Sequence, residues 1–210
     1  MPSVCMKDYI AISAPVNYPY GDFSGNHLLL TTENFSSDMP VNGVCLNSTN
    51  LPTAEAQIMQ VLFVAPVPPS GNMIVDGTAY GSVGIQQVST VGAGNAQGST
   101  VTRIYASVVQ LTPTSSTSIS GGDQIIWQGA NYVDGGNANT PNTAQFNIPF
   151  WLTIDNAQIQ RNCRIGLMIK VWGYCAQYYT AVQWNKIGIV VNAQNKTTSF
   201  SLPIAVQGDF

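Results

Sequence analysis

In the segment from Cys163 to Gly173 every second residue, from Cys163 to Val171, is apolar, the residues between them are of mixed type, and this period of two constrains the fold most. Successive side chains of a strand point to opposite faces, so the alternation predicts a half-buried antiparallel strand with one wet or partner-covered face. The positions on the predicted buried face are Cys163, Ile165, Leu167, Ile169 and Val171. Helical periodicity is scarce, because Gly, Pro and Asn interrupt nearly every window of sufficient length. We therefore expect an all-β protein.

Further strands are predicted at intervals along the whole chain. The run from Ile58 to Ala65 is almost continuously apolar, which is typical of a strand covered on both faces. The other predicted strands span residues 27–32, 73–75, 82–88, 100–111, 124–128, 145–154, 181–192 and 197–206. One short helix of one or two turns is expected at residues 53–57. Together these segments predict about eight to ten strands in an antiparallel β-sandwich.

The connections between the predicted strands indicate how the chain is organised. Stretches rich in Gly, Asn and Ser at residues 92–99, 113–122 and 129–143 are longer than hairpin turns. Loops of this length suit the ends of a sandwich or a single jelly roll. Residues 1–26 are rich in Pro and aromatic residues near their end and are interpreted as an extended N-terminal arm. We expect residues 27–210 to form one jelly-roll β-sandwich domain.

Charged residues make up only 8% of the chain, against about 25% in an ordinary soluble domain. Because the cores of protein interfaces are depleted in charge, such a surface is suited to being covered by other protein. The seven Lys and Arg residues form no run that could grip a phosphate backbone, so weak or no nucleic-acid binding is expected. The chain shows neither a secretory signal pattern nor an apolar run of the roughly 18 residues that a transmembrane segment needs.

Residues that could support catalysis are few. His27 is the only histidine, and it is interpreted as a hydrogen-bonded residue at the start of a strand. No Gly-x-Ser-x-Gly elbow is present, and Glu33 and Glu55, the only glutamates, do not form a recognisable pair of catalytic carboxylates. The sequence therefore predicts that the chain is not an enzyme, and it assigns no catalytic, cofactor-binding or metal-ligating residue.

Three further features of the sequence are interpreted as structural rather than functional. They are the cysteines, a glycine-rich loop and the possible glycosylation triplets. The four cysteines are Cys5, Cys45, Cys163 and Cys175. They lack zinc-ligand spacing and are interpreted as small buried apolar groups, with a disulfide, for instance between Cys163 and Cys175, as the alternative. Residues 134–139 are expected to form a turn held by Asn and Asp rather than a calcium loop. Asn-x-Ser/Thr triplets, expected to be unused, begin at Asn34, Asn47 and Asn195.

Aromatic residues with a polar group are plentiful, and they are enriched both at protein interfaces and in sugar-binding grooves. Trp127 and Trp151 lie in predicted strands, where core packing is the simpler interpretation. Tyr178 and Tyr179 are adjacent, so in a strand their rings would face opposite ways and at least one is expected to be exposed.

The strand count, the long loops, the aromatic arm and the low charge together resemble the single jelly-roll coat proteins of icosahedral viruses. Picorna-like coat proteins are the nearest, and coat proteins of membrane-containing viruses with upright single jelly rolls are equally compatible. The resemblance implies a virion protein, made in the host cytoplasm, that assembles with copies of itself or related subunits and uses no cofactor. A host receptor or glycan is a further partner that it implies. The alternative is a carbohydrate-binding β-sandwich, such as a lectin or a fibre-tip domain.

Overall fold

The computed structural model describes residues 4–15, 27–31, 44–47, 51–65, 73–89, 99–133, 142–175, 185–191 and 198–206. Within these ranges it contains twelve strands and no helix, which confirms the predicted all-β class. Eight strands are the main ones: β1 (Val4–Pro15), β4 (Ala56–Val64), β5 (Met73–Ser89), β6 (Ser99–Leu111), β8 (Gln124–Val133), β9 (Asn142–Ile159), β10 (Arg164–Cys175) and β12 (Ser199–Val206). The other four are β2 (His27–Thr31), β3 (Val44–Asn47), β7 (Ser116–Ser118) and β11 (Lys186–Val191).

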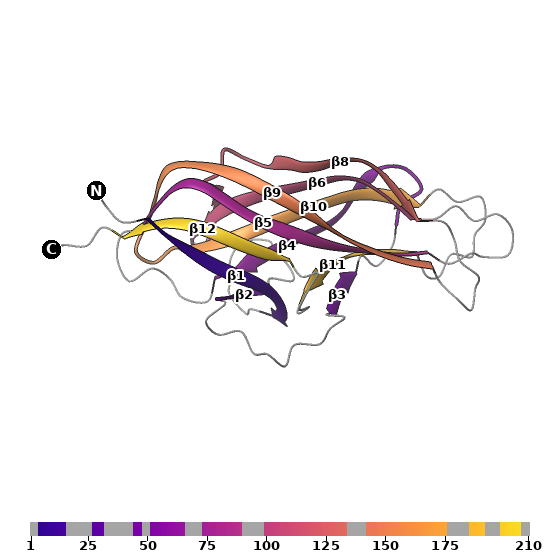
Figure 1. The fold of residues 1–210 in the computed structure, drawn as a ribbon, viewed down its shortest axis with the longest axis horizontal. Helices are drawn as coiled ribbons and strands as arrows, with labels where there is room; N and C mark the ends of the chain where they lie inside the picture. The colour runs from indigo at the N-terminus through magenta and orange to yellow at the C-terminus, as the bar shows by residue number, and fades with distance from the viewer. Residues whose placement is uncertain are drawn as a thin grey trace, which may run out of the picture.

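The eight main strands pair as nested antiparallel partners. The first pairs with the last (β1 with β12), the second with the seventh (β4 with β10), the third with the sixth (β5 with β9) and the fourth with the fifth (β6 with β8). Contacts of β5 with β12 and of β6 with β10 then assemble the pairs into two sheets, β1-β12-β5-β9 and β4-β10-β6-β8. Two such sheets packed face to face form the predicted jelly-roll sandwich, whose strands run along the long axis in Figure 1.

The four shorter strands extend and join the two sheets. β2 pairs antiparallel with β1 and parallel with β4, where His27 is opposite Phe63, so it links the two sheets along one side. β11 pairs with the second half of β5 and carries β3 on its other edge. β7 pairs with the end of β6.

Three local predictions differ from the structure. Residues 4–15 were expected in the N-terminal arm, but they form β1 inside a sheet, where Tyr9 and Ala11 are buried; residues 16–26 lie outside the described residues. No helix forms at residues 53–57, because the chain bends at 53–54 and β4 begins at Ala56. The two short strands predicted at 73–75 and 82–88 are parts of one strand, β5, which continues through Gly77 at a φ of 118°.

The main core lies between the two sheets and contains an aromatic stack. Phe150 of β9 and Phe200 of β12 have ring centroids 6.4 Å apart, and Phe200 and Tyr9 of β1 have centroids 6.3 Å apart. All three rings are buried, and burial raises the pKa of the Tyr9 phenol because it disfavours the charged form. These rings hold three strands of the first sheet together from the inside.

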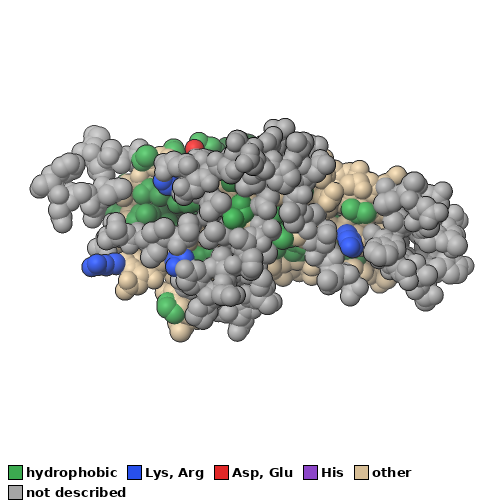
Figure 2. All heavy atoms as spheres, turned by 90° about the horizontal axis from the view of Figure 1, so that it is seen from below, with side chains coloured by type: hydrophobic (Ala, Val, Ile, Leu, Met, Phe, Trp, Pro, Cys, Tyr) green, Lys and Arg blue, Asp and Glu red, His purple; other side chains and the backbone are tan. Residues whose placement is uncertain are grey.

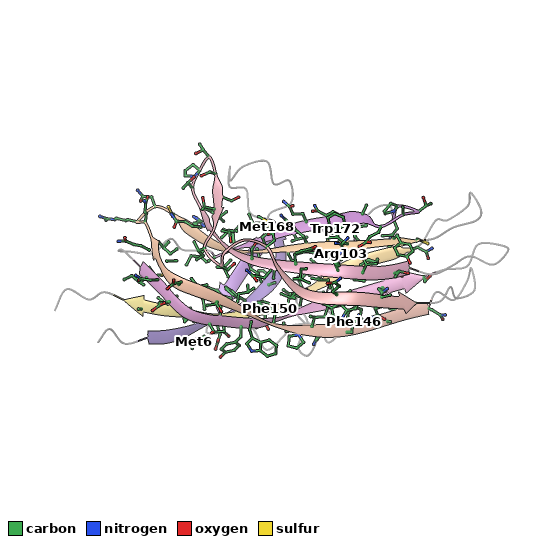
Figure 3. All side chains as sticks on the ribbon, turned by 90° about the horizontal axis from the view of Figure 1, so that it is seen from above. Met6, Arg103, Phe146, Phe150, Met168 and Trp172 are labelled. Atoms are coloured by element: carbon green, nitrogen blue, oxygen red, sulfur yellow. The ribbon has the colours of Figure 1, made fainter. Side chains whose placement is uncertain are left out.

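A second, smaller apolar cluster lies on the opposite face of the sheet that contains β10. Its members are Leu62, Val64, Val109, Leu111 and Met168. The face of β10 that was expected to be wet or partner-covered is therefore buried at Met168, and it becomes partly exposed at Lys170 and Trp172. Figure 3 shows Met168 and Trp172 on one layer of the sandwich and Phe150 and Met6 on the other.

Candidate functional site

Four outward-facing residues form a continuous row across the first sheet, and we call this set the aromatic row. Tyr80 of β5 lies directly opposite Trp151 of β9 on one side and Ser201 of β12 on the other. Ser201 in turn lies opposite Asp8 of β1. Trp151 is 69% exposed and Tyr80 is 46% exposed, although both lie well inside their strands. Exposed aromatic residues of this size in the middle of a sheet make the row the leading candidate for a binding site.

Short hydroxyl side chains surround the two exposed rings. Ser201 Oγ donates a hydrogen bond to the Asp8 carboxylate within the row. In the next row of the sheet, the hydroxyls of Ser82 and Ser199 are 3.1 Å apart. On the other side of the rings, the exposed residues Thr78 and Thr153 lie directly opposite each other. Most of the side chains around the rings therefore carry a hydroxyl group, and the exposed Pro149, opposite Ser82, is an apolar exception.

The inner face of the same strands supports the aromatic row. Gly81, Phe150, Phe200 and Tyr9 are the inward-facing neighbours of Tyr80, Trp151, Ser201 and Asp8. A β-carbon at Gly81 would collide with the carbonyl oxygen of Ser199 and lie 2.7 Å from Phe150 Cζ. The absence of a side chain at residue 81 thus lets the buried rings approach each other beneath the row.

The outer face of the second sheet is chemically different, because it carries ion pairs. Glu55 Oε1 lies 2.6 Å from Arg103 Nη2 and accepts a hydrogen bond of 2.8 Å from the Thr102 hydroxyl. The hydrogen bonds from Thr102 and Arg103 lower the pKa of the Glu55 carboxyl, and Glu55 in turn raises the pKa of the Arg103 guanidinium. The guanidinium carbon of Arg103 also lies 4.9 Å from the ring centroid of Trp172, and both residues are labelled in Figure 3.

A second ion pair lies on the same sheet. Lys170 Nζ is 2.6 Å from Asp123 Oδ2, and the Ser107 hydroxyl donates a 2.9 Å hydrogen bond to Asp123 Oδ1. Both ion pairs satisfy their charges internally and leave no single-signed cluster. We therefore regard this face as a solvated surface rather than as a charged binding site.

A buried polar network lies where β5 and β10 end and β6 begins. Ser89 Oγ donates to Asn185 Oδ1 at 3.0 Å, and Asn185 Nδ2 donates to Cys175 Sγ at 2.8 Å. Gln87 Nε2 donates to the backbone carbonyls of Ser99 and Asn131, each at 3.0 Å. These hydrogen bonds pair buried polar groups with one another and with backbone carbonyls near the strand termini, which is a structural role.

Those residues singled out in the sequence that the structure describes lie in different parts of the fold. His27 begins β2, and Asn47 ends β3. Other predicted positions lie outside the described residues: Glu33, Asn34, residues 134–139, Tyr178, Tyr179 and Asn195. Among the residues described, no group of three or more His, Cys, Asp and Glu side chains could hold a metal ion. In the same part of the chain, no helix is both long and apolar enough to cross a membrane.

The cysteine predictions are partly corrected. Cys163 and Cys175 are both buried and neither forms a disulfide; Cys163 directly precedes β10 and Cys175 ends it, so the suggested disulfide between them is wrong. Cys5 is exposed, in contrast to the expected burial. The side chain of Cys45 lies outside the described residues.

Tyr80 and Trp151 were missed as site residues. Core packing was the simpler interpretation of Trp151 because it lies in a predicted strand. However, the alternation of β9 already separates it from the core, since Phe150 and Leu152 are buried while Trp151 and Thr153 are exposed. The alternation in β9 could therefore have identified Trp151 as exposed, but it could not show that Trp151 pairs with Tyr80.

Comparison with known proteins gives matches only among solved structures. No family model matches the chain, and no curated protein matches it. A CocE/NonD family hydrolase from Staphylococcus aureus is similar at 6% identity and a TM-score of 0.45, over 98% of this chain and 37% of that one. An alpha-amino acid ester hydrolase is similar at 12% identity and a TM-score of 0.37, over 70% and 26% of the two chains. A structure of infectious bursal disease virus, Gx strain, is similar at 10% identity and a TM-score of 0.26, over 98% and 57%.

These matches correct the prediction that the chain is not an enzyme. Hydrolases and an aminopeptidase are among the matched structures. This chain spans only 26–37% of the length of those enzymes. The TM-scores of all these structures are below 0.5, and no activity or residue role is carried over from them.

Proposed function

We propose that this chain is a structural subunit that assembles with copies of itself, or with related subunits, into an icosahedral shell. The observation that carries the proposal is the nested pairing of the eight main strands in two sheets. This jelly-roll arrangement is the architecture of viral capsid domains, and it also occurs in lectins and cupins. The low content of charged residues favours a capsid subunit over a lectin or a cupin, because a subunit of a shell has most of its sides covered by other subunits.

Strand β8 is the contact that we propose for assembly. Among the described strands it pairs only with β6, and its ten residues contain no charge and no proline. Natural proteins usually protect a free edge strand with charged residues, with proline or with β-bulges. Two register shifts in the β6–β8 ladder bend the strand, so a regular continuation of the ladder is disfavoured. The side chain of Ile125, which is 53% exposed, would instead pack against a neighbouring subunit.

The distribution of cations supports a shell component that makes little contact with a genome. Arg103 and Lys170 are ion-paired with carboxylates, and Arg164 is buried. On the face in Figure 2, blue Lys and Arg side chains appear as separate patches among the visible described residues. Counterion release requires several cations along one backbone, so we propose that another component faces the nucleic acid.

Sedimentation velocity and negative-stain microscopy of the full chain, at low and at high salt, test the proposal. We expect large particles or small defined oligomers, and we expect Ile125→Lys to shift the population toward monomer. The matched control is Gln158→Lys, which adds the same charge at an exposed position of β9 and should assemble normally. A wild-type protein that stays monomeric under every condition would contradict the proposed function. Normal assembly of Ile125→Lys would contradict the role of β8.

A further inference from the structure

The aromatic row combines two features that seldom occur together on a sheet surface. Trp151 and Tyr80 expose large rings side by side on neighbouring strands. Directly opposite residues of an antiparallel pair have β-carbons roughly 4.5–5.5 Å apart, so both rings can contact one ligand or two adjacent units of it. Beyond the rings, Ser201 and Asp8 continue the same row with a hydroxyl and a carboxylate that are hydrogen-bonded to each other.

We propose that the aromatic row is a binding site for a neutral carbohydrate. A sugar ring presents C–H groups on its face and hydroxyl groups around its edge. Trp151 and Tyr80 offer flat apolar faces for the C–H groups, and the row ends in groups that accept and donate hydrogen bonds to hydroxyls. The hydroxyls of Ser82, Thr78 and Thr153, in the flanking rows, extend this polar border on both sides.

The charge on the outer face of the first sheet favours neutral saccharides over anionic ones. On β1, β5, β9 and β12, the outward positions that flank the rings carry no Lys or Arg among the described residues. The charged groups near the rings are carboxylates: Asp8 in the row and the exposed Asp76 and Asp155 toward one end of β5 and β9. A sialylated or sulfated glycan would bring like charge to this face, and a neutral one would not.

The exposed area of the aromatic row fits a sugar better than a second copy of the protein. An aromatic side chain buries about 150–250 Å² when it is fully covered, so two rings supply at most roughly 300–500 Å². The area available here is smaller, because Trp151 is 69% exposed and Tyr80 is 46% exposed. A stable protein interface needs about 800 Å² per partner, with an apolar core of several residues. Here the two rings are bordered by hydroxyl residues and by the exposed Pro149, so the apolar area matches a small ligand.

The inner face of the sheet preorganises the site. Beneath the row, the buried rings of Phe150, Phe200 and Tyr9 stack across the same strands, and Gly81 gives them the space to do so. Aromatic side chains have only two rotatable side-chain angles, so little conformational entropy is lost when they bind. A rigid platform of this kind binds without first having to order its backbone.

Immobilised oligosaccharides of defined structure test the proposal with the full-length protein. The probes are neutral oligomers of glucose, mannose, galactose and N-acetylglucosamine, with sialylated and sulfated oligosaccharides for comparison. We expect at least one neutral series to be bound by the wild type and at least about tenfold more weakly by Trp151→Ala and by Tyr80→Ala. Trp151→Phe, which keeps an aromatic ring, should retain part of the binding. Trp172→Ala removes a Trp from the outer face of the other sheet and should bind as the wild type does.

Three results would overturn the carbohydrate site. They are failure of the wild type to bind any neutral oligosaccharide, binding to sialylated or sulfated probes alone, and unchanged binding after loss of Trp151 and Tyr80. Loss of assembly in Trp151→Ala, in a protein that binds no sugar, would instead identify the row as a contact between copies. Ile125→Lys keeps this test separate from the proposed function, since a monomeric variant should still bind the sugar.

Discussion

The ring of Phe150 on β9 occupies the space that a side chain at Gly81 on β5 would need. A β-carbon at residue 81 would lie 2.7 Å from Phe150 Cζ, and it would also collide with the carbonyl oxygen of Ser199. Because Gly81 provides this space, Phe150 and Phe200 stack across β5 on the core side of the sheet. Trp151 and Tyr80 are the next residues along the same two strands and face outward. One glycine thus couples the packing of the core to the position of the exposed aromatic pair.

Substitution Gly81→Ala should lower the free energy of unfolding by about 1–3 kcal/mol, since the added methyl group would collide with the Ser199 carbonyl oxygen and the Phe150 ring. Urea denaturation monitored by circular dichroism measures the change. The control is Thr78→Ala, an exposed change three residues earlier in β5, which should stay within about 0.5 kcal/mol of the wild type. Equal stability of Gly81→Ala and the wild type would show that the aromatic stack does not depend on this close approach.

The hydrogen bonds of Asn185 with Ser89 and Cys175 lead to a second prediction. Asn185→Ala should lower the free energy of unfolding by about 1–3 kcal/mol, because it removes two hydrogen bonds from a buried polar network. The same denaturation experiment applies, with the exposed Gln158→Ala as its control. If Asn185→Ala and the control are equally stable, the network contributes nothing measurable.

The buried Tyr9 predicts a loss of stability at alkaline pH. Burial raises the pKa of Tyr9 above its ordinary value of about 10, so its stabilising contribution is complete below that value and is lost as the pH rises through the raised one. In Tyr9→Phe this contribution to the pH dependence is absent. Urea denaturation at about pH 8 and about pH 11 should therefore show the wild type losing more stability than the variant. Parallel losses in the two proteins would count against the burial of the phenol.

The Glu55 carboxylate predicts a loss of stability at acidic pH, whereas Tyr9 predicts a loss at alkaline pH. Hydrogen bonds from Thr102 and Arg103 lower its pKa, so its stabilising contribution is present above the ordinary value of about 4.3 and is lost as the pH falls through the lowered one. Nuclear magnetic resonance titration of the Glu55 side chain measures this pKa directly. Thr102→Val should move it upward, because the hydrogen bond from Thr102 is the largest cause of the shift. An unchanged titration would exclude that hydrogen bond in solution.

The faces of individual strands were predictable from the sequence because side-chain direction follows local periodicity. On β10, Ile165, Leu167 and Ile169 are buried in the main core as the alternation predicted. The same period could not show that Met168, on the other face, is also buried. Its neighbours Leu62 and Val109 belong to strands far away in the sequence, so this cluster exists only once β4, β10 and β6 are side by side.

The same difference between local periodicity and strand pairing applies to Trp151 and Tyr80 in the candidate site. The exposure of Trp151 follows from the alternation of β9, even though we interpreted it as a core residue. Its pairing with Tyr80 depends on the register of β9 against β5, in which residues 71 positions apart meet. A shift of register by one residue would place Trp151 opposite a different side chain and on the other face.

The sequence by itself determined the all-β class, the position of most strands and the low charge of the surface. These are local or additive properties: periodicity, turn-forming residues and composition. Only the tertiary structure decided which strand pairs with which, that residues 4–15 complete a sheet, and that Trp151, Tyr80, Ser201 and Asp8 share one row. Strand pairing joins segments as distant as Val4 and Ala205, and a period of two specifies the face of a residue without specifying its partner.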